Sequence, residues 1–435
     1  MRLRIQNFAK ISHADLQFKG LTIIAGKNNT GKSTVGKVLY SFYRSFSNID
    51  RRVRDERINA IRNSFSEIPG YDEKTDVISL LSHGHSVRQI TETILERFWS
   101  KDSHLGVKKP SPREAESMVD AFARNVEESV RRSMDASDLI YTQEIIRRVF
   151  ECVFHGQYHP LKTSDESAKL QLTVQGEDNV LTFEPHFWRY NCPTKFVNKA
   201  RIISSPETLS LINARTFDTD KNLANYFDKY TLELAKDLRR QDDMLSPGER
   251  DTIKTKLDRI VLALDSVIKG RFALDKQNDF SLSEEGHSVP TKAQNLSMGL
   301  KSFVLLRHLL SRGVLRERDV LIFDEPENHL HPSNQILYAK AIVMLQKDFN
   351  LTVMVTTHSS YFANALLRFV VTEGISKDTH FYLSKEDEAH PGFCTFEDRG
   401  MTPGKIFRSF NEAYGVLSQM SGEFVGDDDS KENFA

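Results

Sequence analysis

The chain has 435 residues, of which 39% are apolar, so it is long enough for two or three domains with hydrophobic cores. Its 59 basic and 60 acidic side chains give a formal charge of −1, which excludes binding of nucleic acid through overall basic charge, although local basic patches stay open. Cys152, Cys192 and Cys394 are too scattered for a disulfide framework or a zinc site. The sequence shows no signal peptide and no apolar run long enough to span a bilayer, so we expect a cytoplasmic protein with no membrane partner.

The first strong pattern is an apolar run at residues 21–25 that leads into Gly26-Lys27-Asn28-Asn29-Thr30-Gly31-Lys32-Ser33, with a helix-compatible segment after it. This context is typical of a phosphate-binding loop, or Walker A motif, and disfavours the alternative of a glycine-rich surface turn. The glycines let backbone N–H groups face a phosphate, the lysine reaches the β and γ oxygens, and the serine hydroxyl ligates Mg²⁺. The predicted nucleotide ligands are Gly26, Asn28, Asn29, Gly31, Lys32, Ser33 and Thr34.

Residues 46–150 form a charged segment with a helical pattern. Arginine pairs at 51–52, 131–132 and 147–148 stand beside amphipathic stretches such as residues 87–99. Two interpretations stay open: a helical arm that binds a partner or DNA, and a solvated helical lobe whose arginines only confer solubility.

The middle of the chain predicts a β-hairpin at residues 170–183 and a second helical unit at about 220–269. Ser246-Pro247-Gly248-Glu249 has the pattern of a capping box, and the helix after it carries apolar residues on one face. These are Ile253, Leu257, Ile260, Val261, Leu264 and Ile268. Core packing is the ordinary interpretation of this face, and an oligomer interface is the alternative. Residues 271–282 then indicate a β segment.

Asn295-Leu296-Ser297-Met298-Gly299 opens a helix whose apolar face continues to Leu310. Because a helix N-terminus offers unpaired N–H groups and a positive dipole, Ser297 and Gly299 are candidate contacts of an anion. Alone, the pattern is equally typical of an ordinary helix cap.

Another apolar run, at residues 319–323, is followed directly by Asp324 and Glu325. In open α/β sheets the ligand crevice lies at the carboxyl ends of the strands, so these carboxylates are predicted to meet the phosphate-binding loop. Asp324 would then hold Mg²⁺ and Glu325 would polarise the attacking water. An ordinary acidic loop is the alternative.

His358, in Thr356-Thr357-His358-Ser359, follows the apolar run at residues 351–355. Its imidazole is suited to hydrogen-bond the γ-phosphate or the attacking water. A solitary histidine after a strand is more often structural, but the other motifs favour the catalytic interpretation.

The end of the chain has two parts. Residues 403–420 predict a helix with Phe407, Phe410, Tyr414 and Leu417 on one face, which closes the fold or docks a subunit. Asp427-Asp428-Asp429 stands near the last residue and is typical of a solvated acidic tail.

Together these motifs resemble those of the cassette-type ATPases related to structural-maintenance-of-chromosomes (SMC), RecF and OLD (overcoming lysogenisation defect) proteins. Residues 3–11 are similar to their first strand and turn, and Asp324-Glu325-Pro326-Glu327-Asn328-His329-Leu330-His331-Pro332 is similar to the OLD-type Walker B motif and D-loop. The resemblance covers residues 1–45 and about 270–365 well and the middle poorly. It implies an α/β fold, namely an ABC-type P-loop ATPase head with a mixed sheet, flanking helices and a helical insertion between the Walker A and signature motifs.

The resemblance also implies a domain order. We expect the first part of the head at 1–45, the helical insertion at 46–150, the rest of the head at 151–400, a C-terminal helix at 401–420 and a disordered acidic tail at 421–435. The signature at Ser297 lacks the double glycine and glutamine of transporter cassettes. Gln157 is the best candidate for the glutamine of the family's Q-loop, and a plain loop glutamine is an equal alternative.

By the same resemblance the chain hydrolyses ATP to ADP and phosphate with Mg²⁺. Glu325 and His358 take the catalytic roles, and Ser33 and Asp324 are the metal ligands. Ser297 and Gly299 of one subunit would contact the γ-phosphate held by another, in an ATP-bridged homodimer or higher oligomer.

Chains of this layout resemble the ATPase subunits of bacterial anti-phage systems of the Septu and PARIS types, in which a separately encoded HNH nuclease or TOPRIM-type toxin is the effector. The resemblance therefore implies a sensor or scaffold subunit. The alternative is a RecF-like DNA-repair ATPase that clamps DNA. An autonomous nuclease would need catalytic carboxylates that the tail does not supply.

Overall fold

The structure is a computed structural model in which the chain divides into two compact units. It describes residues 1–72, 74–101, 110–157, 167–184, 188–212, 227–239, 256, 258–260, 262, 264, 268, 270–274, 280–283, 286, 288–311, 313–402 and 404. One unit is built from Met1–Ser47 and Val149–Ala435, and the other is Asn48–Arg148. The first unit is therefore discontinuous in sequence, and the second is inserted into it.

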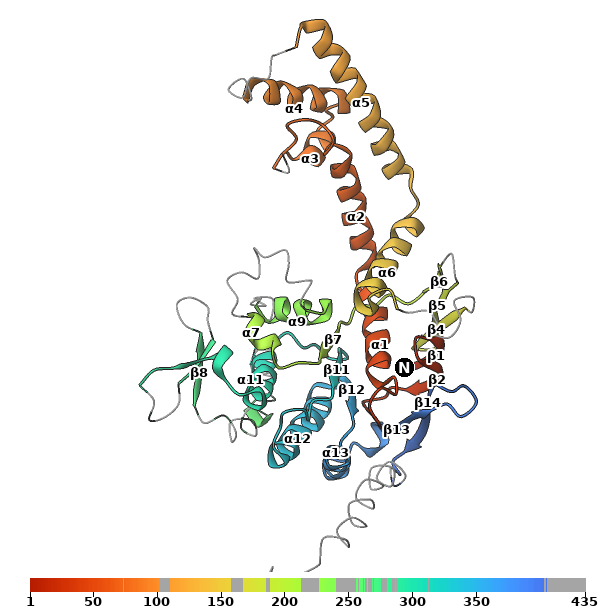
Figure 1. Ribbon diagram of the computed structural model, residues 1–435, viewed down its shortest axis with the longest axis vertical. Coiled ribbons are helices and arrows are strands. Elements are labelled where there is room, and N and C mark those ends of the chain that lie inside the picture. Colours follow the sequence, from red (N-terminus) through yellow and green to blue (C-terminus); the bar gives the residue numbers. More distant parts are fainter. Residues whose placement is uncertain are drawn as a thin grey trace, which may run out of the picture. The chain divides into compact units, whose positions relative to one another are not determined.

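An eleven-stranded mixed sheet organises the first unit (Figure 1). Its order is β6-β5-β4-β1-β2-β14-β13-β3-β12-β11-β7. The strands are β1 (Arg2–Phe8), β2 (Ile11–Gln17), β3 (Leu21–Gly26), β4 (Ala168–Val174), β5 (Glu177–Phe183), β6 (Trp188–Asn191), β7 (Ala200–Ile203), β11 (Val320–Asp324), β12 (Thr352–Thr357), β13 (Thr379–Glu386) and β14 (Cys394–Gly400). The run β13-β3-β12-β11-β7 is parallel, so the carboxyl ends of these five strands lie along one edge.

The parallel part is buried because its strands are continuous apolar runs. All six residues of β3 and the first four of β11 are buried, which is typical of strands covered on both faces. The rest of the sheet is mainly antiparallel, and β4 and β5 form the hairpin predicted at residues 170–183. These features confirm the predicted α/β class with a mixed sheet.

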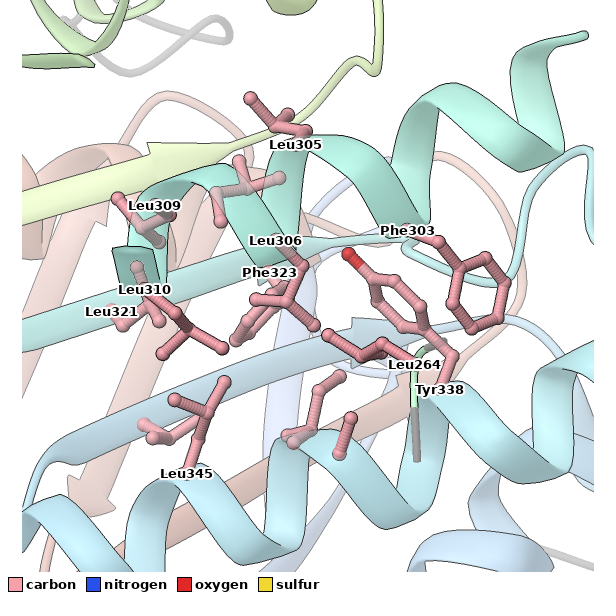
Figure 2. Packing of buried hydrophobic residues seen from close by; sticks show 14 of the residues in the cluster. Leu264, Phe303, Leu305, Leu306, Leu309, Leu310, Leu321, Phe323, Tyr338 and Leu345 are labelled. Atoms are coloured by element: carbon pink, nitrogen blue, oxygen red, sulfur yellow. The ribbon is translucent and has the colours of Figure 1, made fainter. Parts of the chain in front are cut away.

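Helices cover both faces of the parallel strands. They are α1 (Lys32–Phe46), α7 (Thr208–Ile212), α9 (Lys229–Arg239), α11 (Met298–Ser311), α12 (Pro332–Phe349) and α13 (Ser360–Thr372). Figure 2 shows Leu321 and Phe323 of β11 packed among side chains of α11 and α12. Ile322 points to the other face, where its Cγ2 would lie 2.9 Å from a Cβ placed on Gly36 of α1. Glycine at this position therefore lets α1 approach the sheet closely.

A ring cluster fixes α12 against the sheet. The Tyr338 ring lies 5.3 Å from that of Phe303 and 6.2 Å from that of Phe323, both edge-on. Figure 2 shows the three rings side by side in the core. Ile260, Leu264 and Ile268, the described members of the apolar face predicted at 253–268, are buried in the same cluster, which favours core packing for that face.

Three antiparallel strands form a separate small sheet before the signature helix. They are β8 (Arg271–Leu274), β9 (Phe280–Ser283) and β10 (Thr291–Lys292), and they confirm the β segment predicted there. Ser246-Pro247-Gly248-Glu249, Ile253, Leu257 and Val261 lie outside the described residues, as do the predicted helix at 403–420 except Gly404 and the tail at 421–435.

The inserted unit is helical and has its own core. Its helices are α2 (Ile49–Ser64), α3 (Val77–Ser82), α4 (Val87–Lys101), α5 (Pro112–Asp135) and the first part of α6 (Asp138–Phe154). Phe65, Ile94, Leu95 and Trp99 are among its buried residues. Within the described part of the chain, no helix is both long enough and apolar enough to cross a lipid bilayer.

The arginines of this helical lobe face carboxylates. Arg57 donates to Asp138 at 2.7 Å, Arg88 to Asp120 at 2.9 Å, and Arg148 to Glu56 at 2.8 Å. Residues 48–148 contain 17 Lys and Arg and 18 Asp and Glu, so the lobe has no basic excess. This balance favours the interpretation of a solvated lobe over a DNA-binding arm.

Candidate active site

The loop after β3 forms the cradle that the Walker A pattern predicts. Gly31 has φ 75° and Asn29 φ 64°, so two residues of the loop adopt the left-handed conformation that bends the backbone around. A Cβ on Gly26 would lie 2.1 Å from Ser384 Oγ of β13, so the strand end admits only glycine. Helix α1 begins at Lys32 with no acidic residue in its first turn, and its free N–H groups are suited to bind an anion.

Lys32 is buried and is held by its own loop. Its Nζ donates to the carbonyl oxygens of Gly26 at 3.0 Å and Lys27 at 2.7 Å. The same atom lies 3.7 Å from Glu325 Oε1. Burial lowers the pKa of Lys32, and the nearby Glu325 and Asp324 carboxylates oppose that shift. The lysine is thus a desolvated cation at the position where a phosphate would be bound.

Ser33 and Asp324 meet directly, although 291 positions separate them. Ser33 Oγ donates to Asp324 Oδ1 at 2.8 Å, and Thr356 Oγ1 of β12 donates to the same oxygen at 2.5 Å. A hydroxyl and a carboxylate are the oxygen donors that Mg²⁺ takes when phosphates and waters complete its shell. The donor set therefore fits the magnesium site expected from the sequence.

Glu325 is positioned by an uncommon backbone conformation. Its φ of 50° is left-handed, and its N–H donates to Thr356 O at 3.1 Å and Thr356 Oγ1 at 3.0 Å. Asn328 Nδ2 donates to its Oε2 at 3.2 Å. A non-glycine residue in this conformation is disfavoured unless its surroundings hold it there, and such residues concentrate at functional sites.

His358 follows β12 and lies beside Glu325. Its Nδ1 is 3.3 Å from Glu325 Oε2, and its side chain is 37% exposed. The adjacent strands β3, β12 and β11 thus bring Lys32, His358 and Glu325 to one edge of the sheet. The structure gathers these three with Ser33 and Asp324, as the sequence predicts.

Ser297 and Gly299, the two signature residues, lie at the start of α11 and not in this cluster. Ser297 is exposed just before α11, where its Oγ accepts from the Leu300 N–H at 3.3 Å and its carbonyl accepts from the Lys301 N–H at 2.9 Å. These described contacts stay within its own helix. A Cβ on Gly299 would lie 2.9 Å from His329 O, so glycine allows α11 to touch the loop after β11.

One segment of this edge was not predicted from the sequence. The loop after β7 lines a cleft with Asp324, Glu325 and Ser302, and contributes Ser204, Ser205 and Pro206. The sequence signal for this strand was weak, because residues 200–203 read Ala-Arg-Ile-Ile and only two consecutive apolar residues precede the polar Ser204 and Ser205. Gln157, the Q-loop candidate, is exposed after the end of α6 and is not among the residues that line this cleft.

Comparison with known proteins finds a matching family model and a curated relative. The model of the AAA ATPase domain family matches residues 1–363. Elongation factor 3 of Candida albicans is 30% identical over 98 residues, which make up 22% of this chain and only 8% of that protein.

Solved structures with weak similarity include two SMC heads. The SMC head domain from Thermotoga maritima has a TM-score of 0.39 and 11% identity over 91% of this chain and 97% of its own. The Smc head domain of Pyrococcus furiosus with an extended coiled coil, bound to the C-terminal domain of ScpA, has a TM-score of 0.40 and 11% identity over 97% of this chain and 98% of its own.

Proposed function

This chain belongs to the AAA ATPase domain family, and we propose that it is the ATP-dependent sensor or scaffold subunit of a bacterial anti-phage defence system. It is an ATPase. The observation that carries the site assignment is the convergence of Lys32, Ser33, Asp324 and Glu325 at the carboxyl ends of β3 and β11, two parallel strands that both pair with β12.

In this proposal each residue of the edge has one task. The N–H groups of the loop and Lys32 bind the β and γ phosphates of ATP, and Ser33 and Asp324 hold Mg²⁺. The bound metal supplies charge neutralisation on the phosphate oxygens. Glu325 orients a water and accepts its proton, and His358 donates a hydrogen bond to the γ-phosphate.

A second subunit completes the site in this proposal. Ser297 stands exposed at a helix N-terminus and makes its described contacts within its own chain, so it is available to a phosphate bound by another copy. Closure of the dimer around ATP would then distinguish two states of the assembly, which a separate effector can read.

The defence role rests on the similarity of Asp324-Glu325-Pro326-Glu327 and the residues after it to the OLD-type motif, together with the charge balance of the lobe. A lobe with 17 basic and 18 acidic side chains suits a protein partner better than a phosphate backbone. We therefore propose a separately encoded HNH nuclease or TOPRIM-type toxin as that partner, and a cytoplasmic location.

The test is co-expression with the neighbouring gene. The two proteins should co-purify, and the effector's nuclease or toxic activity should be lost with Lys32→Ala and locked in one state with Glu325→Gln, which binds ATP but cannot turn it over. The exposed Glu388→Gln serves as the matched control. Tight, salt-sensitive DNA binding by the isolated ATP-bound protein, with no partner gene nearby, would refute this role and favour the RecF-like clamp.

A further inference from the structure

Glu327 is a buried acid that has no role in the mechanism described so far. It lies three residues after Asp324, and only 3% of its surface is exposed. Acidic side chains are rarely buried to this extent without a charged or hydrogen-bonded partner. Its surroundings therefore indicate what it does.

Its contacts tie together the two loops that carry the catalytic side chains. Glu327 Oε1 accepts a hydrogen bond from Thr357 Oγ1 and another from the His358 backbone N–H at 3.1 Å. Thr357 Oγ1 in turn accepts from the Ser359 N–H at 3.0 Å, and Ser359 Oγ caps α13 through the Phe362 N–H at 3.1 Å. One carboxylate oxygen thus fixes the backbone on both sides of His358.

The imidazole of His358 also faces this carboxylate. His358 Nδ1 lies 3.7 Å from Glu327 Oε1 and 3.3 Å from Glu325 Oε2. Among the described residues, neither Nδ1 nor Glu327 Oε2 has a hydrogen-bond partner, and both atoms are buried. Since Nδ1 is turned toward the two glutamates, Nε2 is the ring nitrogen that remains for a ligand.

We propose that Glu327 is a positioning residue for ATP hydrolysis, which acts through His358 by anchoring its backbone and setting the direction of its imidazole. This inference rests on the proposed function of the site. Glu327 itself does not touch the nucleotide in this proposal. Its contribution is to keep His358 in place between β12 and α13 while Glu325 orients the water.

Glutamine, a neutral isostere of glutamate, separates the positioning role of Glu327 from a role of its negative charge. Burial raises the pKa of Glu327, so this site favours the neutral carboxyl group more than a surface position does. Glutamine has an acceptor oxygen at the same place, and it can accept from Thr357 Oγ1 and the His358 N–H as the carboxylate does. Alanine removes that acceptor.

The experiment is a double-mutant cycle on the full-length protein, with kcat, KM, ATP affinity and Tm measured for each variant. Glu327→Ala should lower kcat by roughly 10–100-fold and leave the ATP Kd within about threefold, because positioning of a general acid or hydrogen-bond donor affects turnover. Glu327→Gln should recover kcat to within about fivefold of wild type. On a His358→Ala background, Glu327→Ala should cost nothing further.

Two results would overturn the proposal. One is an equal loss of kcat from Glu327→Ala with and without His358. Another is a parallel loss of ATP affinity and Tm that Glu327→Gln does not restore, which would indicate a purely structural acid. If Glu327→Ala does not fold, Thr357→Val removes one donor to Glu327 with little change in volume, and its kcat loss must likewise vanish on the His358→Ala background. Normal hydrolysis by Lys32→Ala would instead refute the proposed function of the site.

Discussion

Lys32 donates its protons to two carbonyl groups of its own loop, and a nucleotide phosphate must replace those acceptors. We predict that Lys32→Ala lowers ATP turnover by at least about 100-fold, because it removes the charge that the buried site holds for the phosphates. The Tm should not fall, because burial makes the charged form of Lys32 less favourable in the folded state than in water, as its lowered pKa indicates. Lys19→Ala, an exposed lysine before β3, is the control. Unchanged hydrolysis in the Lys32 variant would contradict the nucleotide site.

The pKa of Glu327 predicts a dependence of stability on pH. An unfolded glutamate titrates near pH ~4.3, and burial raises the folded pKa above that value. The folded chain therefore binds this proton more tightly than the unfolded chain, so the stabilisation is complete below the unfolded pKa and is lost as pH rises through the folded pKa. We predict that Glu327→Gln, which has no proton to lose, melts at a higher temperature than wild type at about pH 8.

The difference in Tm should narrow as the pH falls toward about 5. The charged or titratable neighbours of this group are Lys32 and His358, and the same comparison on a His358→Ala background removes the imidazole that lies 3.7 Å from Glu327 Oε1. A difference in Tm that does not change with pH would contradict the raised pKa of Glu327.

At the scale of elements, a buried ion pair joins the β7 strand to the start of β11. Arg201 donates to Asp319 Oδ2 at 2.9 Å, with side chains only 5% and 2% exposed. Asp319 also accepts from the backbone N–H groups of Lys199 at 3.0 Å and Arg316 at 3.1 Å. These contacts set the position of β7 and hence of the unpredicted loop at Ser204.

We predict that Asp319→Ala lowers the free energy of unfolding by about 2–3 kcal/mol, because it removes one of the two carboxylates that pair with the buried Arg201 guanidinium, Asp237 being the other, and also the acceptor of two backbone N–H groups. Asp55→Ala removes the exposed pair with Arg51, where the side chains are 58% and 82% exposed, and should change stability by less than about 0.5 kcal/mol. Urea denaturation of both variants provides the measurement. Equal effects would mean that the buried pair does not hold β7.

The whole assembly is tested by mixing two inactive variants. Ser297→Arg should block hydrolysis by obstructing the site of the other subunit, while ATP binding to its own loop stays near normal. In a heterodimer with Lys32→Ala, a site shared between subunits would combine the intact loop of one chain with the intact signature of the other.

Equal mixing should therefore recover up to about one quarter of wild-type activity, because about half of the dimers are mixed and each has one intact site of two. Sequential affinity purification through two different tags verifies the heterodimer. If a verified heterodimer stays inactive, the signature does not act across subunits.

The sequence predicts the elements better than the contacts between them. Continuous apolar runs identify β3, β11 and β12, and the polar residues that follow each run locate Lys32, Asp324, Glu325 and His358. β7 was missed because its four residues include Arg201 and therefore contain no continuous apolar run to recognise. The burial of Glu327 could not be predicted in this way. It depends on packing between the loop after β11 and the loop after β12, which are about thirty residues apart, and no local pattern encodes that packing.

The order of strands in the central sheet has a consequence for how the protein is made. β3, at residues 21–26, pairs with β12 on one side and β13 on the other, so a strand synthesised early is enclosed by two strands synthesised more than 300 residues later. At the usual rates of translation this interval lasts roughly 20–60 s. During that time the apolar β3 lacks both of its neighbours, and non-local pairings of this kind form slowly. The nascent chain therefore exposes an aggregation-prone strand, and the nucleotide site cannot form until β11, β12 and β13 have left the ribosome.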